Sequence, residues 1–327
     1  MSLPRVDYRS NAGCLCRHRG VSLIELVVVI TISGIIATVL GAIIVHPIQG
    51  YEAQVRRAQL VDAAEMAVRR LGRDIRQALP NSVRVRDALG NTNSVNCSTA
   101  GAACTIEMLN TLDGARYRDG PGQISGGHNH GPTQYRLRFN GTDTDGFNIV
   151  GFFQNITVPF TSTTQRLSVY NQGVTGADAY ADANSDLTAP RVITNPTYTT
   201  FSINNDDYLP TPDEHRIVPL TGSFWFRYAS PNQRVFVVDT PVSYVCSAGA
   251  NGNITRYWSY PITAAQQSTP AGATSALLST PVTACNINYS PGTNQRAGLV
   301  TLDITVADAA SGEQVRLLYQ VHVDNSP

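Results

Sequence analysis

The feature that most constrains this chain is an uncharged apolar stretch close to its N-terminus. Residues Leu26 to Val45 contain no charged side chain. At about 1.5 Å of rise per residue, a helix of that length spans roughly 30 Å, the thickness of one hydrocarbon core. A single acidic residue, Glu25, stands directly before the stretch. We therefore expect one transmembrane helix over residues 21–45, with an ionisable group at its edge.

Basic residues dominate the segment that precedes the apolar stretch. Residues 1–20 contain four arginines and one aspartate, so the positive-inside rule places this segment in the cytoplasm and the rest of the chain across the membrane. A secretory signal would carry a cleavage site of small residues after the apolar stretch, whereas His46 and Pro47 follow it here. The membrane helix is thus predicted to be retained, with an extracytoplasmic domain beyond it.

The junction Gly20–Val21 lies before the apolar stretch, and Glu25 is the fifth residue after it. This arrangement resembles the class III signal peptide of type IV prepilins and type II secretion pseudopilins. The resemblance implies that a prepilin peptidase removes residues 1–20 as a cytoplasmic leader, that Val21 becomes a methylated N-terminus, and that Glu25 pairs with the N-terminus of a neighbouring subunit. Such a pairing would relieve the cost of a charge in lipid. The alternative is a lone glutamate that reaches the headgroups of an ordinary anchor.

Small residues recur every four positions in the expected membrane helix, at Ser33, Ala37 and Gly41. This spacing lets helices approach closely in lipid, so the three residues are candidates for subunit packing, although small residues are common in membrane helices generally. Two features depart from the usual pilin pattern. Val21 stands where Phe or Met is usual, and the proline common in the middle of major-pilin membrane helices is missing. The second departure favours a minor subunit.

A second helical pattern follows Pro47 and continues to Leu79. Pro80 disfavours helix at the residue before it, so we expect one long helix whose amphipathic part covers residues 46–80. Arginines gather on its other face, but acidic residues are interleaved and no aromatic set accompanies them, so no nucleic-acid partner is expected. The apolar positions are Tyr51, Val55, Ala58, Val61, Ala64, Val68, Leu71, Ile75 and Leu79.

Beyond Val83 the pattern changes to short alternating runs divided by turn residues, which predicts antiparallel strands. The fold class is therefore α+β: a long N-terminal helix packed on a β-rich head domain over residues 81–327, as in pilin-like folds. Hairpin turns are expected at residues 230–233 and 309–312, and loops at 114–132 and 175–189. The predicted strands are Tyr135–Phe139, Phe147–Phe153, Arg166–Tyr170, Tyr198–Ile203, Phe224–Tyr228, Arg234–Val238, Val242–Cys246, Arg256–Tyr260, Leu299–Val306 and Val315–Val323.

Four of the six cysteines lie in the part predicted to be exported, where disulfides form. They are Cys97, Cys104, Cys246 and Cys285; Cys14 and Cys16 belong to the leader. Four cysteines allow three connectivities. We prefer Cys97 with Cys104, which closes a short loop, and Cys246 with Cys285. A zinc site is the alternative, but the C-x2-C spacing typical of one is missing.

Catalytic motifs are not found: the chain has no phosphate loop of the GxxxxGK[ST] type, no HExxH and no GxSxG. We therefore expect a protein that is not an enzyme and needs no cofactor. Two acidic segments are similar to calcium loops but lack the terminal glutamate. Acidic turns explain them more simply, and calcium stays open as the alternative. The aspartates concerned are Asp143, Asp145, Asp182 and Asp186.

Several segments are similar to minor pilins of the MSHA pilus biogenesis system. The resemblance implies a low-abundance subunit that helps assemble or prime a filament. Its partners would be other major and minor pilins, the prepilin peptidase and the inner-membrane assembly platform. It would span the bacterial inner membrane once before assembly and lie in the pilus or at the cell surface afterwards. A tip-displayed adhesin or binding module and a type II secretion pseudopilin are the alternatives. The segments are His46–Val85, Leu112–Arg118, Val242–Cys246, Thr255–Tyr260, Arg296–Val306 and Val321–Pro327.

Overall fold

The computed structural model describes residues 20–92, 94–96, 103–119, 135–206, 214–292, 297–308 and 311–326. By internal contacts the chain divides into two compact units, Met1–Val55 and Arg56–Pro327. The boundary falls inside the first helix rather than at residue 45 or 80, where the sequence pattern changes. Each unit is considered by itself below.

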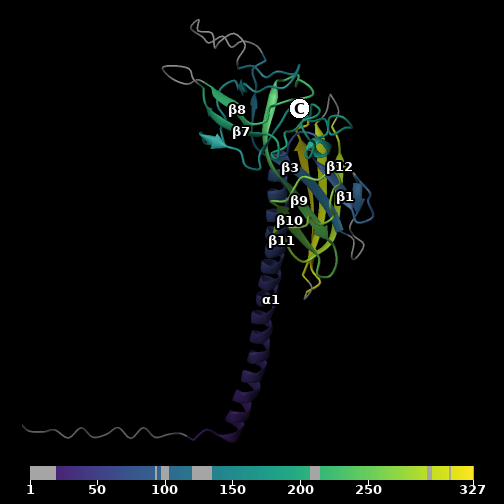
Figure 1. The fold of residues 1–327 in the computed structure, drawn as a ribbon. Coiled ribbons are helices and arrows are strands. Elements are labelled where there is room, and N and C mark those ends of the chain that lie inside the picture. Colours follow the sequence, from purple (N-terminus) through teal and green to yellow (C-terminus); the bar gives the residue numbers. More distant parts are fainter. Residues whose placement is uncertain are drawn as a thin grey trace, which may run out of the picture. The chain divides into compact units, whose positions relative to one another are not determined.

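The first helix, α1, covers Leu23–Arg76 and continues through Pro47. It ends three residues before the predicted Leu79, because the backbone there bonds to a strand instead of continuing the helix. The Leu79 N–H donates to the Leu109 carbonyl at 2.8 Å, and the Thr111 N–H donates to the Gln77 carbonyl at 3.0 Å. This exchange joins the end of α1 to the strand β3 (Figure 1).

In the residues described, the second unit contains three antiparallel sheets. The largest has the order β1-β3-β9-β10-β11, with β6 also paired to β9; the other two have the orders β14-β13-β12-β2 and β4-β8-β7-β5. The elements are β1 (Arg84–Asp87), β2 (Ser94–Asn96), β3 (Ala103–Arg116), β4 (Phe147–Asn148), β5 (Phe160–Thr161), β6 (Arg166–Ser168), α2 (Ala179–Asp182), β7 (Thr200–Asn205), β8 (His215–Thr221), β9 (Arg234–Ser247), β10 (Asn253–Trp258), β11 (Thr274–Ser279), β12 (Val282–Ser290), β13 (Gly298–Ala307) and β14 (Gln314–Val323). An α+β fold with a long N-terminal helix is thus confirmed.

One apolar core joins the C-terminal part of α1 to two of the sheets. Ala64, Val68, Leu71 and Ile75 of α1 are buried in it. The strands β3, β9 and β10 contribute from one sheet, and β12, β13 and β14 from the other. Along β13 buried residues alternate with partly exposed ones, which is the pattern of a sheet with one face on a core. The helix therefore supplies a central part of this core.

A second, aromatic core lies around the sheet of β4, β8, β7 and β5. Phe147 and Phe224 meet in a T-shaped contact with ring centroids 5.6 Å apart, a favoured geometry for aromatic pairs. The long strand β9 reaches both cores, because Val235 and Val237 lie in the aromatic core while Val242 lies in the helix core. The two cores are therefore connected through one strand.

Several strand predictions were wrong. Tyr135–Phe139 and Phe224–Tyr228 form no strand, although Phe224 makes an isolated bridge with Asp143. The runs 234–238 and 242–246 are one strand, β9. The strands β1, β2, β3, β5, β8, β11 and β12 were not predicted. In β3 the residues from Cys104 to Leu109 are all buried, so the strand lacks the alternation that marks a half-exposed one.

The turn predictions had mixed outcomes. The hairpin that joins β13 to β14 is confirmed by their pairing. A turn forms at residues 230–233, where the Gln233 N–H donates to the Ser230 carbonyl at 3.0 Å, but a strand follows it only on the C-terminal side. The loop expected from Gly114 begins later, because β3 continues to Arg116. The loop expected at 175–189 contains the short helix α2.

Candidate functional site

The N-terminal end of α1 carries the predicted assembly residue, Glu25, in its first turn. Gly20 to Ser22 lie outside the helix. The Ser22 hydroxyl accepts a hydrogen bond from the Glu25 N–H at 3.3 Å, and the Ser22 carbonyl accepts from the Leu26 N–H at 3.1 Å. Ser22 thus caps the helix, and the Ser-x-x-Glu spacing is that of a capping box. Our sequence interpretation missed this cap, although the spacing itself signals it.

The position of Glu25 at the helix N-terminus stabilises its negative charge. A helix N-terminus carries a partial positive charge, which favours an acidic side chain in the first turn. In the described part of the chain the Glu25 carboxylate makes no side-chain hydrogen bond or ion pair. The carboxylate is therefore held at the start of the helix with its acceptor positions open to another group.

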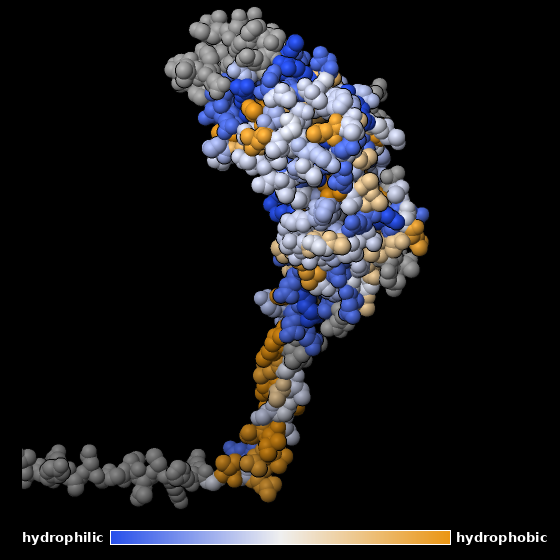
Figure 2. Space-filling model, viewed as in Figure 1, coloured by the Kyte–Doolittle hydropathy of each residue, from blue (hydrophilic) through white to orange (hydrophobic). Residues whose placement is uncertain are grey.

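The segment Leu23–Gly41 is long and apolar enough to cross a membrane, with a mean hydropathy of 2.6 and no part of it buried. Leu23, for example, is 82% exposed and Ile35 64% exposed. The apolar surface of this segment is seen in Figure 2. An exposed apolar surface of this extent marks contact with a membrane or with other protein.

The two threonine hydroxyl groups within this segment are compatible with lipid. Thr31 donates to the Val28 carbonyl at 2.9 Å, and Thr38 donates to the Ile35 carbonyl at 2.8 Å. These bonds satisfy the hydroxyls inside the helix, as a hydrocarbon environment requires. The hydroxyls of Thr31 and Thr38 therefore need no partner from water.

The predicted packing residues Ser33, Ala37 and Gly41 are all exposed. A Cβ atom built on Gly41, or on the neighbouring Gly34, meets no atom within 4 Å. This side of the helix has no partner within the described residues. Another helix could approach closely there, as the small-residue spacing predicts.

The amphipathic part of α1 is buried over a shorter length than predicted. Tyr51 is 69% exposed and Val55 36% exposed, and Ala58 is exposed as well. Continuous burial of the apolar stripe begins at Ala64. The sequence pattern therefore marks an apolar face without showing how much of that face the chain's own sheets cover.

A buried carboxylate attaches α1 to the largest sheet. Asp74 is 3% exposed and accepts hydrogen bonds from the Tyr244 hydroxyl at 2.7 Å and from Arg256 Nε at 2.8 Å. Arg70 lies 3.4 Å from the same carboxylate. Burial raises the pKa of Tyr244, and the neighbouring Asp74 raises it further, so this hydroxyl stays protonated and donates to Asp74.

A close contact between α1 and the Tyr319 side chain of β14 adds to this attachment. A Cβ atom on Gly72 would lie 2.8 Å from Cε1 of Tyr319 on β14, closer than such atoms pack. Any larger residue at position 72 would therefore require the Tyr319 ring to shift. On the exposed face of the helix, Arg69 Nε donates to Glu65 at 2.9 Å.

The preferred disulfide between Cys246 and Cys285 is present and joins β9 to β12. It therefore links the two sheets that pack against α1. Cys104 is also disulfide-bonded. Cys97, its predicted partner, lies outside the described residues.

All four calcium candidates are already engaged within the chain: Asp145 pairs with Arg138 at 2.8 Å, and the other three accept backbone N–H groups. Asp143, which is fully buried, accepts from the N–H groups of Asp145 and Gly146, both at 3.1 Å. Asp182 accepts from the Val192 N–H at 2.9 Å, and Asp186 from the Thr188 N–H at 3.1 Å. Among the residues that the structure describes, no three acidic, histidine or cysteine side chains are placed to share a metal. The calcium alternative stays untested.

A comparison with known protein families assigns the N-terminal segment. Residues 15–41 match the family described as the prokaryotic N-terminal methylation motif. The match contains the Gly20–Val21 junction, Glu25 and the small-residue stripe. No curated protein and no solved structure matches the chain. The matched motif and the apolar helix give this chain the N-terminal segment typical of type IV pilins and pseudopilins, which are made as prepilins and anchored in a membrane.

Proposed function

We propose that this chain is a minor pilin, similar to MshO of the MSHA pilus, that takes part in assembling or priming the filament. The methylation motif supports a pilin or pseudopilin in general. The finer role is supported by the sequence segments that are similar to MSHA minor pilins and by the missing proline in the membrane helix. The observation that carries the proposal is the exposed apolar part of α1 with Glu25 in its capped first turn.

The proposed mechanism begins with removal of the leader. Cleavage after Gly20 frees the amino group of Val21, two residues before α1 begins. In a filament the Glu25 carboxylate then pairs with the methylated amino group of a neighbouring subunit. Either charge alone would be costly in an apolar environment, and pairing offsets part of that cost. The pair would set the axial position of one subunit against the next.

The same proposal gives the location and partners. Before assembly the chain spans the bacterial inner membrane once, with its N-terminus in the cytoplasm. The prepilin peptidase and the inner-membrane assembly platform act on it there, and other major and minor pilins contact α1 afterwards. The stripe of Ser33, Ala37 and Gly41 is the surface we assign to those helix contacts.

The processing step can be tested with the variant Gly20→Asp. A charged side chain at the cleaved bond should block the peptidase and leave a precursor that migrates more slowly on a denaturing gel. The control is Gly41→Ala, which changes a glycine far from the junction and should be processed normally. Normal processing and normal piliation in Gly20→Asp would overturn the proposal.

A further inference from the structure

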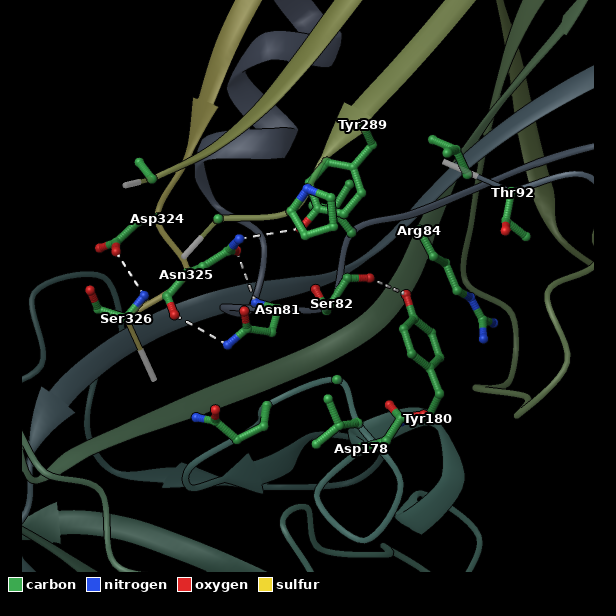
Figure 3. A pocket seen from close by; sticks show the side chains of 18 of the residues that line it. Asn81, Ser82, Arg84, Thr92, Asp178, Tyr180, Tyr289, Asp324, Asn325 and Ser326 are labelled. Atoms are coloured by element: carbon green, nitrogen blue, oxygen red, sulfur yellow. Dashed lines mark hydrogen bonds between the residues drawn. The ribbon is translucent and has the colours of Figure 1, made fainter. Parts of the chain in front are cut away.

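A groove of about 1270 Å³ opens on the second unit. Its walls come from several distant parts of the chain, among them the connection from α1 through β1, the loop before α2, the turn at Pro231 and Asn232, and the tail after β14 (Figure 3). Binding sites for drug-sized molecules usually enclose about 300–1,000 Å³. The groove is therefore large enough for an extended ligand of several linked units.

Hydrogen bonds between side chains fix one side of the groove. The Asn325 amide oxygen accepts from the Asn81 N–H at 3.2 Å, and its amide nitrogen donates to the Tyr289 hydroxyl at 3.2 Å. The Asn81 side chain donates to the Asn171 carbonyl at 2.9 Å. The tail after β14 is thus tied to the start of β1 and to the loop before α2. This part of the groove is formed before any ligand arrives.

Unusual backbone conformations gather at the same place. Asn81 and Tyr170, which line the groove, have φ of 59° and 58°, and Gln233, next to the lining residue Asn232, has φ of 57°. The left-handed region is unfavourable for a bulky side chain such as tyrosine. Conformations of this kind persist where surrounding contacts enforce them and are concentrated at ligand sites. Their gathering here points to a functional surface.

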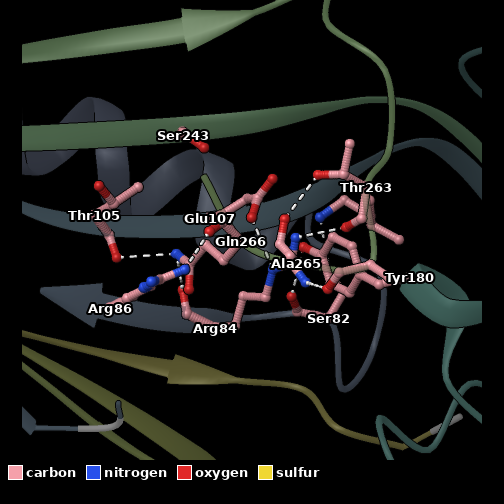
Figure 4. A network of polar contacts seen from close by, with 12 residues as sticks. Ser82, Arg84, Arg86, Thr105, Glu107, Tyr180, Ser243, Thr263, Ala265 and Gln266 are labelled. Carbon is pink, nitrogen blue, oxygen red and sulfur yellow. Dashed lines mark hydrogen bonds and ion pairs between the residues drawn. The ribbon is translucent and has the colours of Figure 1, made fainter. Parts of the chain in front are cut away.

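The charged residues of the groove balance one another and are already engaged. Arg84 Nε donates to Glu107 at 2.7 Å, and its guanidinium lies 3.5 Å from the ring centroid of Tyr180. Glu107 also accepts from Tyr260, and Figure 4 shows Arg84, Glu107 and Tyr180 in this polar network. The groove as a whole has no net formal charge, so nothing in it selects an ionic ligand. Its charged lining residues are Arg84, Arg86, Asp178 and Asp324.

Neutral hydrogen-bonding groups elsewhere in the lining are left for a ligand. The amides of Gln172 and Asn232 and the hydroxyl of Tyr170 make no hydrogen bond within the described part of the chain. Each side-chain amide has an NH2 group that donates and a carbonyl oxygen that accepts. A hydroxyl group, which can also donate and accept, can pair with either. The ring of Tyr170 adds an amphipathic surface next to them. This combination suits a ligand that carries many hydroxyl groups on an apolar frame.

An extended peptide fits the groove less well. Such peptides are usually held by adding a strand to a free sheet edge. The edge at the groove is β1, where the Arg84 carbonyl already accepts from the Gln266 side chain at 3.3 Å and Arg86 forms a bridge with Thr92. The backbone groups that a peptide strand would use are thus occupied at these positions.

We propose that this groove binds a neutral oligosaccharide. The ligand class follows from the balanced charge, the open amides of Gln172 and Asn232, the aromatic wall and the extended volume. The proposal goes beyond the filament role. It identifies this groove as the site at which the chain would act if it is a binding module. Binding is measured on the purified protein without a filament, so failure of one proposal is distinguishable from failure of the other.

The test uses the full-length protein in a detergent whose headgroup is not a sugar. The probes are neutral oligosaccharides of about two to six glucose, galactose, mannose or N-acetylglucosamine units, titrated calorimetrically to about 1 mM. We expect at least one probe to bind. The double variant Gln172→Ala/Asn232→Ala should weaken that binding by at least about tenfold, because each lost hydrogen bond contributes about 1 kcal/mol.

The control variant is Gln320→Ala, which removes an exposed amide on β14 outside the groove. It should bind like the unaltered protein, and thermal melting of each variant verifies that it is folded. The proposal is overturned if no neutral probe binds, or if binding is unchanged in the double variant. It is also overturned if the groove takes only charged sugars or takes peptides from a parallel peptide array.

Discussion

The two parts of α1 have the same secondary structure but opposite surroundings. From Leu23 to Gly41 the helix has no buried residue, whereas Ala64, Val68 and Leu71 are among the most buried residues of the chain. The apolar side chains of the C-terminal part find partners on two sheets of the same molecule. Within the described residues those of the N-terminal part have none, and an apolar surface of this extent marks contact with lipid or other protein chains.

The acidic residues of the two parts differ in the same way. Asp74 is held by Tyr244 and Arg256 from the sheet. In the described part of the chain Glu25 has only the capped start of its own helix. One carboxylate therefore completes the fold, while the other is available for assembly. Changes in the first part should alter assembly without altering stability, and changes in the second part should do the reverse.

The largest effect is expected for Glu25→Ala. Leaving one member of a buried charge pair unpaired costs about 3–5 kcal/mol, so the number of pili, counted by electron microscopy, should fall by more than about tenfold. The melting temperature of the purified protein should not change. The control is Glu65→Ala, which breaks an exposed pair worth about 0.5 kcal/mol. Normal piliation in Glu25→Ala would remove the proposed role of this residue.

The next effect is a loss of stability in Asp74→Ala. The change leaves Arg256 and Tyr244 without their acceptor, and we expect the free energy of unfolding to fall by about 3–5 kcal/mol. Urea unfolding followed by tryptophan fluorescence measures this loss, since Trp258 lies close to Arg256. A loss below about 1 kcal/mol, the usual value for a surface pair, would mean that Asp74 does not attach the helix.

A pair of glycine variants compares the two parts of α1 directly. Gly72→Ala places a methyl group against the Tyr319 ring and should lower the free energy of unfolding by about 1–3 kcal/mol, the usual cost of overpacking. Gly50→Ala adds the same group where no atom lies within 4 Å, so it should not destabilise the protein. Equal effects of the two variants in the same urea experiment would contradict the difference in packing.

The smallest effect is expected for Asp303→Asn on the surface of β13. Hydrogen bonding to Arg316 lowers the pKa of Asp303 below its ordinary value of 3.8. A lowered pKa stabilises the folded state above pH 3.8, and the contribution is lost as the pH falls through the folded-state pKa. The variant should be about 0.5 kcal/mol less stable at pH 7. The urea midpoints of the variant and of the unaltered protein should converge as the pH falls below 3.8. A difference that stays constant with pH would show that the ion pair is not the cause of the lost stability.

The sequence predicted the parts of the molecule that depend on local pattern. An uncharged run of apolar residues specifies a helix whatever surrounds it, so the residues around Glu25 could be assigned directly. The buried strand β3 could not, because its residues face protein on both sides and show no alternation. The groove was also unpredictable, since Asn81, Tyr170 and Asn325 lie far apart in the chain and meet only through the packing of the sheets.

The most direct test of the central claim is the N-terminal residue of the protein extracted from membranes. The proposed processing predicts a chain that begins at Val21, with a methylated amino group, while the apolar part of α1 is retained. Mass spectrometry of the intact protein and of its N-terminal peptide distinguishes the outcomes. A chain that begins at Met1, or one cut after the apolar helix, would contradict the account.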